Sequence, residues 1–300
     1  MRKSARAAAE KGGAALSIIK TEGLTYVYGE NTPFRKVALD NVDLEINEGE
    51  ILGVIGHTGS GKSTLIQHFN GLMKPTSGRV LVDGEDFAAD KEKLRAVRFK
   101  VGLVFQYPEY QLFEETVYKD IAYGPKNMKL EEQEIDRRVR ETAELVGLDP
   151  EILDKSPFEL SGGQKRRAAI AGVMAMEPRV LILDEPASGL DPQGRDRIFE
   201  IIKRYHEEKG STVLIVSHSM EDIARLADRI LVMNEGKVFC CAEPPAVFSR
   251  STELEQIGLS VPQVTRVFNA LNEMGFGLPQ DVYTVKYAEK VLRERLEQES

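Results

Sequence analysis

One stretch of the chain has the residue types and the spacing needed to hold phosphate groups. Residues 56–63 read Gly-His-Thr-Gly-Ser-Gly-Lys-Ser and fit the pattern G-x-x-x-x-G-K-[ST]. Phosphates are charged, so a protein that takes them from water must present several N–H donors at once, and glycines let the backbone turn tightly enough to do so. We expect Lys62 to reach the β- and γ-phosphates of a nucleotide and the Ser63 hydroxyl to ligate Mg²⁺. The loop therefore predicts that the chain binds a nucleotide.

The segments on either side of this loop supply the context that the pattern requires. An apolar run at residues 51–55 predicts a strand, and a helical run over residues 63–72 follows the loop. The positive N-terminal end of that helix adds to the attraction for phosphate. A glycine-rich turn without a ligand is the other interpretation, and the flanking strand and helix argue against it.

A second candidate site is a pair of carboxylates far downstream. Residues 180–185 read Val-Leu-Ile-Leu-Asp-Glu, which places Asp184 and Glu185 at the end of an apolar strand. In parallel α/β sites, the phosphates lie at this end of the strands. Asp184 would hold Mg²⁺ and Glu185 would polarise the water that attacks the γ-phosphate, since phosphoryl transfer depends mostly on positioning and charge stabilisation. A lone acidic pair usually only solvates a surface, but the strand and the phosphate-binding loop favour catalysis.

The third motif is Leu-Ser-Gly-Gly-Gln at residues 160–164, directly before a long helical segment. Ser161 is a natural N-cap, and the glycines leave backbone N–H groups open at the start of that helix. The motif thus predicts a second anion site in the same chain. An ordinary capped helix is the alternative, which the two other motifs make less plausible.

Composition sets the broad class of the protein. Of 300 residues, 42% are hydrophobic and 29% charged, as in soluble globular proteins, and the net charge of −8 gives nucleic acid no electrostatic attraction. Cys240 and Cys241 are adjacent and cannot join distant segments, so we expect a reducing compartment. No apolar run approaches the roughly 20 residues that span a bilayer, and we interpret residues 1–17 as a flexible tail rather than a signal peptide. Any membrane role is expected to come through partners.

The strand pattern predicts an α/β fold of mixed character. Segments 18–28 and 37–46 are predicted to be strands, and residues 42–46 alternate apolar and polar residues, which is typical of a half-exposed antiparallel sheet. The short continuous apolar runs at 101–105, 180–183 and 212–216 are typical of buried parallel strands. We therefore expect an antiparallel flank joined to a parallel nucleotide-binding core.

Two further regions are predicted to be helical. A charged insertion covers roughly residues 114–176, between two of the apolar strands. Beyond residue 236, apolar residues recur at helical spacing and predict a small C-terminal helical extension that packs either on the chain itself or on a partner. The residues of this stripe are Val264, Val267, Phe268, Leu271, Ala288, Val291, Leu292 and Leu296.

Together these motifs resemble the ATP-binding-cassette (ABC) ATPases over roughly residues 18–240. The loop at 56–63 matches their Walker A motif, residues 160–164 match their signature, and residues 180–185 match Walker B. The resemblance implies a P-loop fold with a RecA-like parallel core, in a domain spanning 18–236 with a helical subdomain at about 107–176 and an extension at 237–300. In that family two cassettes pair head to tail, so Ser161 and Gly163 would contact the ATP held by the partner's loop.

The resemblance also assigns roles to residues outside the three motifs. Tyr28 matches the aromatic residue that stacks on adenine, although a plain strand aromatic is the other interpretation. Gln106 matches the Q-loop glutamine, Asp191 the D-loop aspartate that communicates across the dimer, and His218 the switch histidine. The implied catalytic residues are Glu185, His218 and Gln106, and the implied Mg²⁺ ligands are Ser63, Gln106 and Asp184. The implied ATP contacts are Tyr28, Gly56, Thr58, Gly59, Ser60, Gly61, Lys62, Ser63, Thr64, Ser161, Gly162, Gly163, Gln164 and Asp191.

Within the ABC proteins, the chain looks like the second ATPase subunit of the energy-coupling factor (ECF) vitamin and metal importers. The segments that carry this likeness are 56–71, 106–125, 160–167, 191–195, 216–222 and the tail 254–300, which in that family helps to hold the ATPase pair together. One departure is the stretch 240–245, where many relatives have a glycine before the proline.

The likeness implies specific partners at the cytoplasmic face of the cell membrane. These are a sister ATPase, a membrane scaffold that docks near residues 106–123, and a membrane protein that binds the substrate. Docking would use a set of aromatic residues, for which packing in the helical core is the competing interpretation. That set is Tyr107, Tyr110, Phe113 and Tyr123.

Three alternatives remain open at the level of sequence. The closest is the ATPase of a homodimeric cobalt or nickel importer. A soluble ABC ATPase of translation or DNA maintenance is disfavoured because the chain has a single cassette and no long heptad run. A binding module without catalysis is disfavoured by Glu185 and His218.

Overall fold

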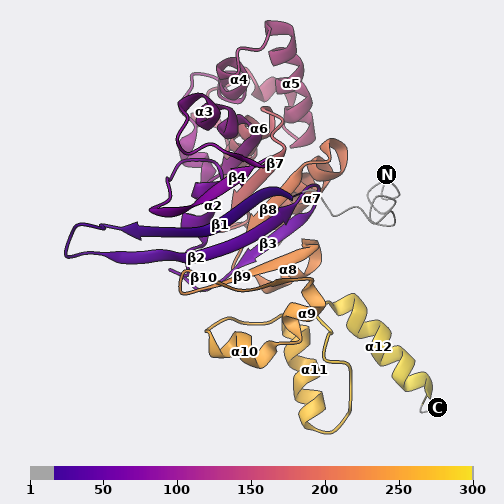
Figure 1. Cartoon of the computed structure of the whole chain (residues 1–300). Helices are drawn as coiled ribbons and strands as arrows, with labels where there is room; N and C mark the ends of the chain where they lie inside the picture. The colour runs from indigo at the N-terminus through magenta and orange to yellow at the C-terminus, as the bar shows by residue number, and fades with distance from the viewer. Residues whose placement is uncertain (1–16, 299–300) are drawn as a thin grey trace, which may run out of the picture.

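The computed structural model describes residues 17–298 and places their strands in two sheets (Figure 1). The first sheet is antiparallel, in the order β2-β1-β4-β5, and the second has the order β10-β9-β3-β8-β7-β6. In the second sheet, β9, β3, β8, β7 and β6 are parallel and β10 is antiparallel to β9. The expected antiparallel flank and parallel core are confirmed. The strands are β1 Ser17–Tyr28, β2 Lys36–Asn47, β3 Ile51–Ile55, β4 Ser77–Val82, β5 Glu85–Asp86, β6 Val101–Val104, β7 Val180–Asp184, β8 Thr212–Val216, β9 Arg229–Asn234 and β10 Lys237–Ala242.

The parallel strands are apolar throughout because both of their faces are covered. In β7, Val180 and Ile182 belong to the apolar core shared with the antiparallel sheet and α2, whereas Leu181 and Leu183 belong to the core on the helical side. Successive side chains of a strand point to opposite faces, so each face needs its own apolar set. In β2, by contrast, Val42 is buried and Asp43 is exposed, as the alternating pattern predicts.

Two groups of helices lie on opposite sides of the sheets in the view of Figure 1. One group, the helical region, consists of α4, α5 and α6, and α4 packs against both of the others. The other group follows β10. The α-helices are α2 Lys62–Phe69, α3 Lys91–Lys100, α4 Val117–Asn127, α5 Glu132–Leu145, α6 Gly162–Met174, α7 Pro192–Lys209, α8 Met220–Leu226, α9 Pro244–Phe248, α10 Ser251–Gln256, α11 Gln263–Glu273 and α12 Val285–Gln298. Short 3₁₀ helices are η1 Pro108–Gln111, η2 Pro150–Ile152 and η3 Pro157–Glu159.

Two of the expected boundaries differ in the structure. Residues 237–242, expected to begin the helical extension, form β10 and pair with β9 in the core sheet. The reason is a two-residue hairpin turn in which Glu235 and Gly236 both have positive φ, 48° and 78°, a geometry that suits the twist of paired strands. At the other end, Ser17 already belongs to β1, and the rest of the expected tail lies outside the described residues.

The C-terminal helices bury only part of their apolar stripe. Phe268 and Ala288 are buried in a small cluster of their own, but Val267 and Leu296 are 55% and 65% exposed. The helical extension is therefore confirmed as a structure, and part of its apolar surface faces solvent. Among residues 17–298, no helix is both long enough and apolar enough to cross a bilayer.

Candidate nucleotide-binding and catalytic site

The parallel register brings the chemically important residues to one edge of the sheet. Val216 in β8 pairs with Val54 in β3 on one side and with Asp184 in β7 on the other. On the far side of β7, Leu183 pairs with Val104 in β6. Residues that follow these strands must therefore emerge at the same edge, which is where ligands bind in open α/β sheets. Those residues are Gly56, Gln106, Glu185 and His218.

The phosphate-binding loop is built around a close backbone approach at Gly61. This residue has φ 103° and precedes α2, and a Cβ atom there would lie 2.6 Å from the carbonyl oxygen of Ala38. Only glycine fits such a position without displacing the neighbouring strand. Gly61 has no side chain to cap α2, so no side chain of the N-cap residue occupies the N–H groups at the start of the helix. This is the arrangement that an anion requires.

Lys62 is held across the mouth of the loop. Its ammonium group donates to the carbonyl oxygens of Gly56 at 2.7 Å and His57 at 3.0 Å. Burial lowers the pKa of Lys62, and the nearby carboxylates Glu185 and Asp184 act in the opposite direction. The loop thus concentrates positive charge where phosphates would sit.

The loop and Tyr28 line one cavity of about 150 Å³. Tyr28 is half-exposed, and its hydroxyl lies 3.2 Å from Thr64 Oγ1. Lys36 and Ala38 line the same cavity, and neither was expected from the sequence. Counting along the hairpin could have found Lys36, because it pairs directly with Tyr28 between β1 and β2. The cavity is lined by Tyr28, Lys36, Ala38, Gly59, Gly61, Lys62, Ser63 and Thr64.

Ser63 and Asp184 meet although they lie on different elements. The Ser63 hydroxyl donates to Asp184 Oδ2 at 3.2 Å. Asp184 is buried, and burial raises its pKa, with the negative charge of Glu185 adding to the rise and the Ser63 hydrogen bond opposing it. A buried carboxylate in this state is stabilised by a nearby cation. The two oxygens form a candidate metal site.

Glu185 and His218 form the second contact between strand ends. His218 Nδ1 lies 2.8 Å from Glu185 Oε2, and the histidine side chain is 77% exposed whereas that of the glutamate is 14% exposed. Glu185 has φ 51°, a left-handed conformation that glutamate rarely adopts, and its N–H donates to the carbonyl of Val216. Strain of this kind persists where the surrounding structure enforces it and is frequent at active sites. The pair has the geometry of a general base and its orienting partner.

The signature residues lie apart from this cluster. Ser161 caps α6 as expected, in a reciprocal capping box with Gln164, whose side-chain oxygen accepts from the N–H of Ser161 at 2.9 Å. Ser161 and Gly162 are exposed. Within residues 17–298, no hydrogen bond or ion pair joins the signature to the Walker A and B residues. If the signature binds a nucleotide, that nucleotide must be presented from outside this cluster.

Gln106 and Asp191 are both exposed. Gln106 follows β6, and Asp191 caps α7 by accepting the N–H of Gly194 at 2.7 Å. Their expected roles toward a nucleotide and a second cassette remain predictions.

The four aromatic residues near the Q-loop are exposed, so the interpretation of this set as helical core is wrong. Their exposed fractions are 41% for Tyr107, 84% for Tyr110, 61% for Phe113 and 48% for Tyr123. Phe113 and Tyr123 meet edge to face at 4.9 Å and line a groove of about 300 Å³ between α4 and α6. We call this the aromatic groove.

A buried ion pair that the sequence did not predict joins η1 to α6. Arg166 in α6 donates to both carboxylate oxygens of Glu109 at 2.6 and 3.0 Å, and to the carbonyl of Ser188 at 2.5 Å. It thus ties the signature helix to the segment after Gln106 and to the loop after Glu185. The residues around Arg166 and Glu109 do not predict this contact, because the two partners are far apart in the sequence.

Comparison with known proteins shows the family to which the chain belongs. A family model described as "ABC transporter" matches residues 39–188, which include the Walker A, signature and Walker B motifs. The chain belongs to the ABC transporter family.

Relatives show which ABC proteins this chain resembles. It is 58% identical over 275 residues to the energy-coupling factor transporter ATP-binding protein EcfA2 of Clostridium tetani, which covers 91% of this chain and 96% of the relative. Among solved structures it resembles cbiO1 of Clostridium perfringens, described as part of the ABC transporter complex cbiONQ, with a TM-score of 0.72, 38% identity and coverage of 85% of this chain and 99% of that one. It also resembles the dimeric ATP-binding cassette MJ0796 bound to ADP and Pi, with a TM-score of 0.67, 31% identity and coverage of 75% and 98%. The expected ABC fold and the resemblance to ECF ATPases are confirmed.

Proposed function

We propose that this chain is the ATP-binding and ATP-hydrolysing subunit of an ECF importer and powers the uptake of vitamins or other micronutrients. The observation that carries the proposal is the convergence of Lys62, the Ser63–Asp184 pair and the Glu185–His218 pair at one sheet edge. The names of the relatives support the assignment to ECF transporters.

Each residue of the site has its own role in ATP hydrolysis. The loop N–H groups and Lys62 hold the phosphates, and Tyr28 covers the base. Glu185 Oε2 accepts a proton from the attacking water, while His218 orients that carboxylate and contacts the γ-phosphate. Gln106, exposed at the end of β6, senses the metal and the attacking water.

The Ser63–Asp184 pair fits Mg²⁺. Both donors are oxygens, which hard cations prefer, and they already lie close together. Ser63, Asp184 and Gln106 would hold the ion. When bound, it would neutralise charge on the β- and γ-phosphates.

A second cassette would complete the site. The exposed start of α6 would offer Ser161 and Gly163 to an ATP bound by that partner, and Asp191, which is also exposed, would communicate with the partner. The similar MJ0796 cassette, whose solved structure is dimeric, supports this arrangement. We propose that the partner is a sister ATPase and that the helical extension after β10 contributes to the contact between the two.

The aromatic groove is the proposed docking surface for a membrane scaffold. Its exposed rings suit an apolar helix from the partner, since aromatic residues dominate binding energy at interfaces. Through the scaffold, the chain would lie at the cytoplasmic face of the cell membrane, and a separate membrane protein would bind the substrate. We propose domain limits of 17–242 for the cassette, with the helical subdomain at about 107–176, and 243–300 for the extension.

The second candidate is the ATPase of a homodimeric cobalt-type importer, favoured by the similarity to cbiO1. Pull-down of the tagged chain from detergent-solubilised membranes, followed by mass spectrometry, separates the two. Recovery of a second cassette ATPase and two polytopic proteins would support the ECF assignment. Recovery of a homodimer with metal-importer subunits would favour the second candidate, and recovery from the cytosol alone would refute transport.

A further inference from the structure

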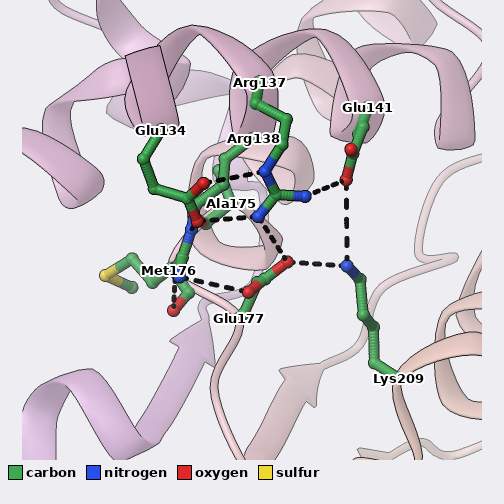
Figure 2. A network of polar contacts seen from close by, with 8 residues as sticks. All are labelled: Glu134, Arg137, Arg138, Glu141, Ala175, Met176, Glu177 and Lys209. Carbon is green, nitrogen blue, oxygen red and sulfur yellow. Dashed lines mark hydrogen bonds and ion pairs between the residues drawn. The ribbon is translucent and has the colours of Figure 1, made fainter. Parts of the chain in front are cut away.

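One carboxylate, that of Glu177, joins three elements that are separate in the sequence (Figure 2). Glu177 Oε1 lies 2.6 Å from the ammonium of Lys209, and Oε2 lies 3.2 Å from the guanidinium of Arg138. Arg138 is in α5, Glu177 follows α6, and Lys209 ends α7. The contact therefore connects the helical region, which carries the signature and the aromatic groove, to the helix that packs on the parallel sheet.

Neighbouring side chains extend this contact into a network. Arg137 binds Glu134 and Glu141, each at 2.7 Å, and lies 4.0 Å from Glu177. Glu141 in turn lies 4.0 Å from Lys209 (Figure 2). Two routes thus cross from α5 to the end of α7, one through Glu177 and one through Glu141.

The backbone at Glu177 is held as firmly as its side chain. Glu177 has φ 51°, a position usually taken by glycine where a helix ends, and its N–H donates to the carbonyl of Met174. Arg138 also donates to the carbonyl oxygen of Met176 at 3.2 Å. A glutamate in this strained conformation points to a role for its carboxylate, because glycine would form the turn at lower energy.

The Arg138–Glu177 ion pair is less exposed to solvent than an ion pair on the outer surface of a helix. The side chains of Arg138 and Glu177 are 14% and 26% exposed, whereas those of Lys203 and Glu207, a pair within α7, are 54% and 58% exposed. Solvent screens the charges of the exposed Lys203–Glu207 pair more strongly than those of the less exposed Arg138–Glu177 pair.

The residue before Glu177 connects the network to the aromatic groove. Met176 lines that groove and packs on α4, where a Cβ atom on Gly124 would lie 2.5 Å from Met176 Cγ. A helix seated in the groove would therefore press on a residue adjacent to Glu177. We infer that Glu177 is a positioning residue, which holds the signature helix α6 and the aromatic groove in one orientation relative to the parallel sheet. When a partner helix docks in the groove, this contact would carry the resulting movement to the orientation of α6. Its effect on turnover rests on the function proposed above.

The first test compares variants in the detergent-solubilised complex assembled from full-length chains. Glu177→Gln and Lys209→Met are each expected to lower the kcat of ATP hydrolysis about fivefold, which corresponds to about 1 kcal/mol. Affinity of the full-length chain for a fluorescent ATP analogue should stay within about twofold, because the contacts of Lys62 are with Gly56 and His57 and those of Glu177 are with Arg138 and Lys209, so the two sites share no partner. Lys209→Arg, which keeps the cation, should restore kcat, and Lys203→Met is the matched control on the same helix. Glu177→Gly removes the carboxylate and also relieves the strain of the left-handed backbone. If the carboxylate is what matters, this variant should lose as much kcat as Glu177→Gln.

Unchanged kcat in Glu177→Gln and Lys209→Met would overturn the inference. So would equal losses of kcat and nucleotide affinity, or a Lys209→Arg variant as slow as Lys209→Met, because these results indicate a purely structural role.

A second measurement does not depend on transport. Hydrogen exchange of the full-length chain should become faster in α5 and in residues 175–179 for Glu177→Gln and Lys209→Met, but not for Lys203→Met. Unchanged exchange would overturn the inference even if ATPase activity fell. Failure of the wild-type complex to hydrolyse ATP would instead refute the proposed function, and the exchange result would still decide the role of Glu177.

Discussion

Glu185 Oε2 and His218 Nδ1 lie 2.8 Å apart, one nearly enclosed and the other open to solvent. The glutamate is held in a left-handed backbone conformation at the end of β7, and the histidine follows the adjacent strand β8. The contact thus fixes the direction of the carboxylate. Pre-positioning of this kind lowers the cost of organising the base and the attacking water.

Glu185→Gln is expected to bind ATP but to lose turnover by a factor of about 10²–10⁴, the range that a general base contributes. The amide keeps the shape of the side chain and cannot accept the proton. ATP hydrolysis by the assembled complex and nucleotide binding by the chain should be measured together. Hydrolysis at the wild-type rate would contradict the assigned role.

Lys62→Ala should weaken ATP binding about tenfold or more, because hydrogen bonds to charged groups contribute about 1.5–3 kcal/mol. Equilibrium binding of a fluorescent ATP analogue measures this directly. Lys203→Met, a surface lysine far from the loop in sequence, serves as the control. Affinity like that of the wild type in Lys62→Ala would count against phosphate binding by this residue.

Ser161→Ala and Gly163→Asp should impair the ATP site of the partner and spare the nucleotide affinity of this chain. The aspartate places a negative charge at a helix start that would face phosphates, so its effect should be the larger, with turnover at that site reduced about 10²-fold or more. Hydrolysis should be measured in dimers of this chain and its partner ATPase, with the Walker A lysine replaced in one of the two subunits at a time. Full activity at both sites would exclude head-to-tail pairing.

Tyr123→Ala should reduce recovery of the membrane scaffold about tenfold in pull-downs, since a central aromatic residue in an interface contributes about 1–4 kcal/mol. ATP binding by the variant chain should be unchanged. Phe34→Ala removes a ring that is 86% exposed but lies outside the groove, and it should have no effect. Equal recovery with both variants would argue that docking occurs elsewhere.

The Glu109–Arg166 pair should make stability depend on pH. Burial alone would raise the pKa of Glu109, but the hydrogen bonds and charge of Arg166 outweigh it, so the pKa lies below its usual value. A lowered folded-state pKa adds stability that is fully present above the unfolded pKa of about 4.3 and is lost as the pH falls through the folded value.

Glu109→Gln should therefore lower the free energy of unfolding at neutral pH by about 2 kcal/mol, a difference that shrinks below about pH 4. Thermal or denaturant unfolding across this range is the measurement. Glu115→Gln removes a carboxylate that is 81% exposed and should change stability by less than about 0.5 kcal/mol. A constant difference between wild type and Glu109→Gln at all pH values would refute the linkage.

Local sequence determined the ligand class and most of the secondary structure. The spacing of Gly61, Lys62 and Ser63 encodes a tight turn at a helix start, and the apolar run before Asp184 encodes a strand covered on both faces. Such signals are contained within a few residues, because turn geometry, capping and side-chain alternation are local properties. The hairpin at Glu235 and Gly236 was missed, although it too is a local signal.

Contacts between distant segments were decided only by the tertiary structure. Parallel register brings Ser63 to Asp184 and Glu185 to His218, and helix packing brings Arg166 to Glu109 and Lys209 to Glu177. The periodicity of apolar and polar residues in the sequence does not predict such pairs, since each pair depends on how whole strands and helices align. The exposure of Tyr123 is a similar case, because the same helical spacing would serve a buried ring and a docking surface equally well.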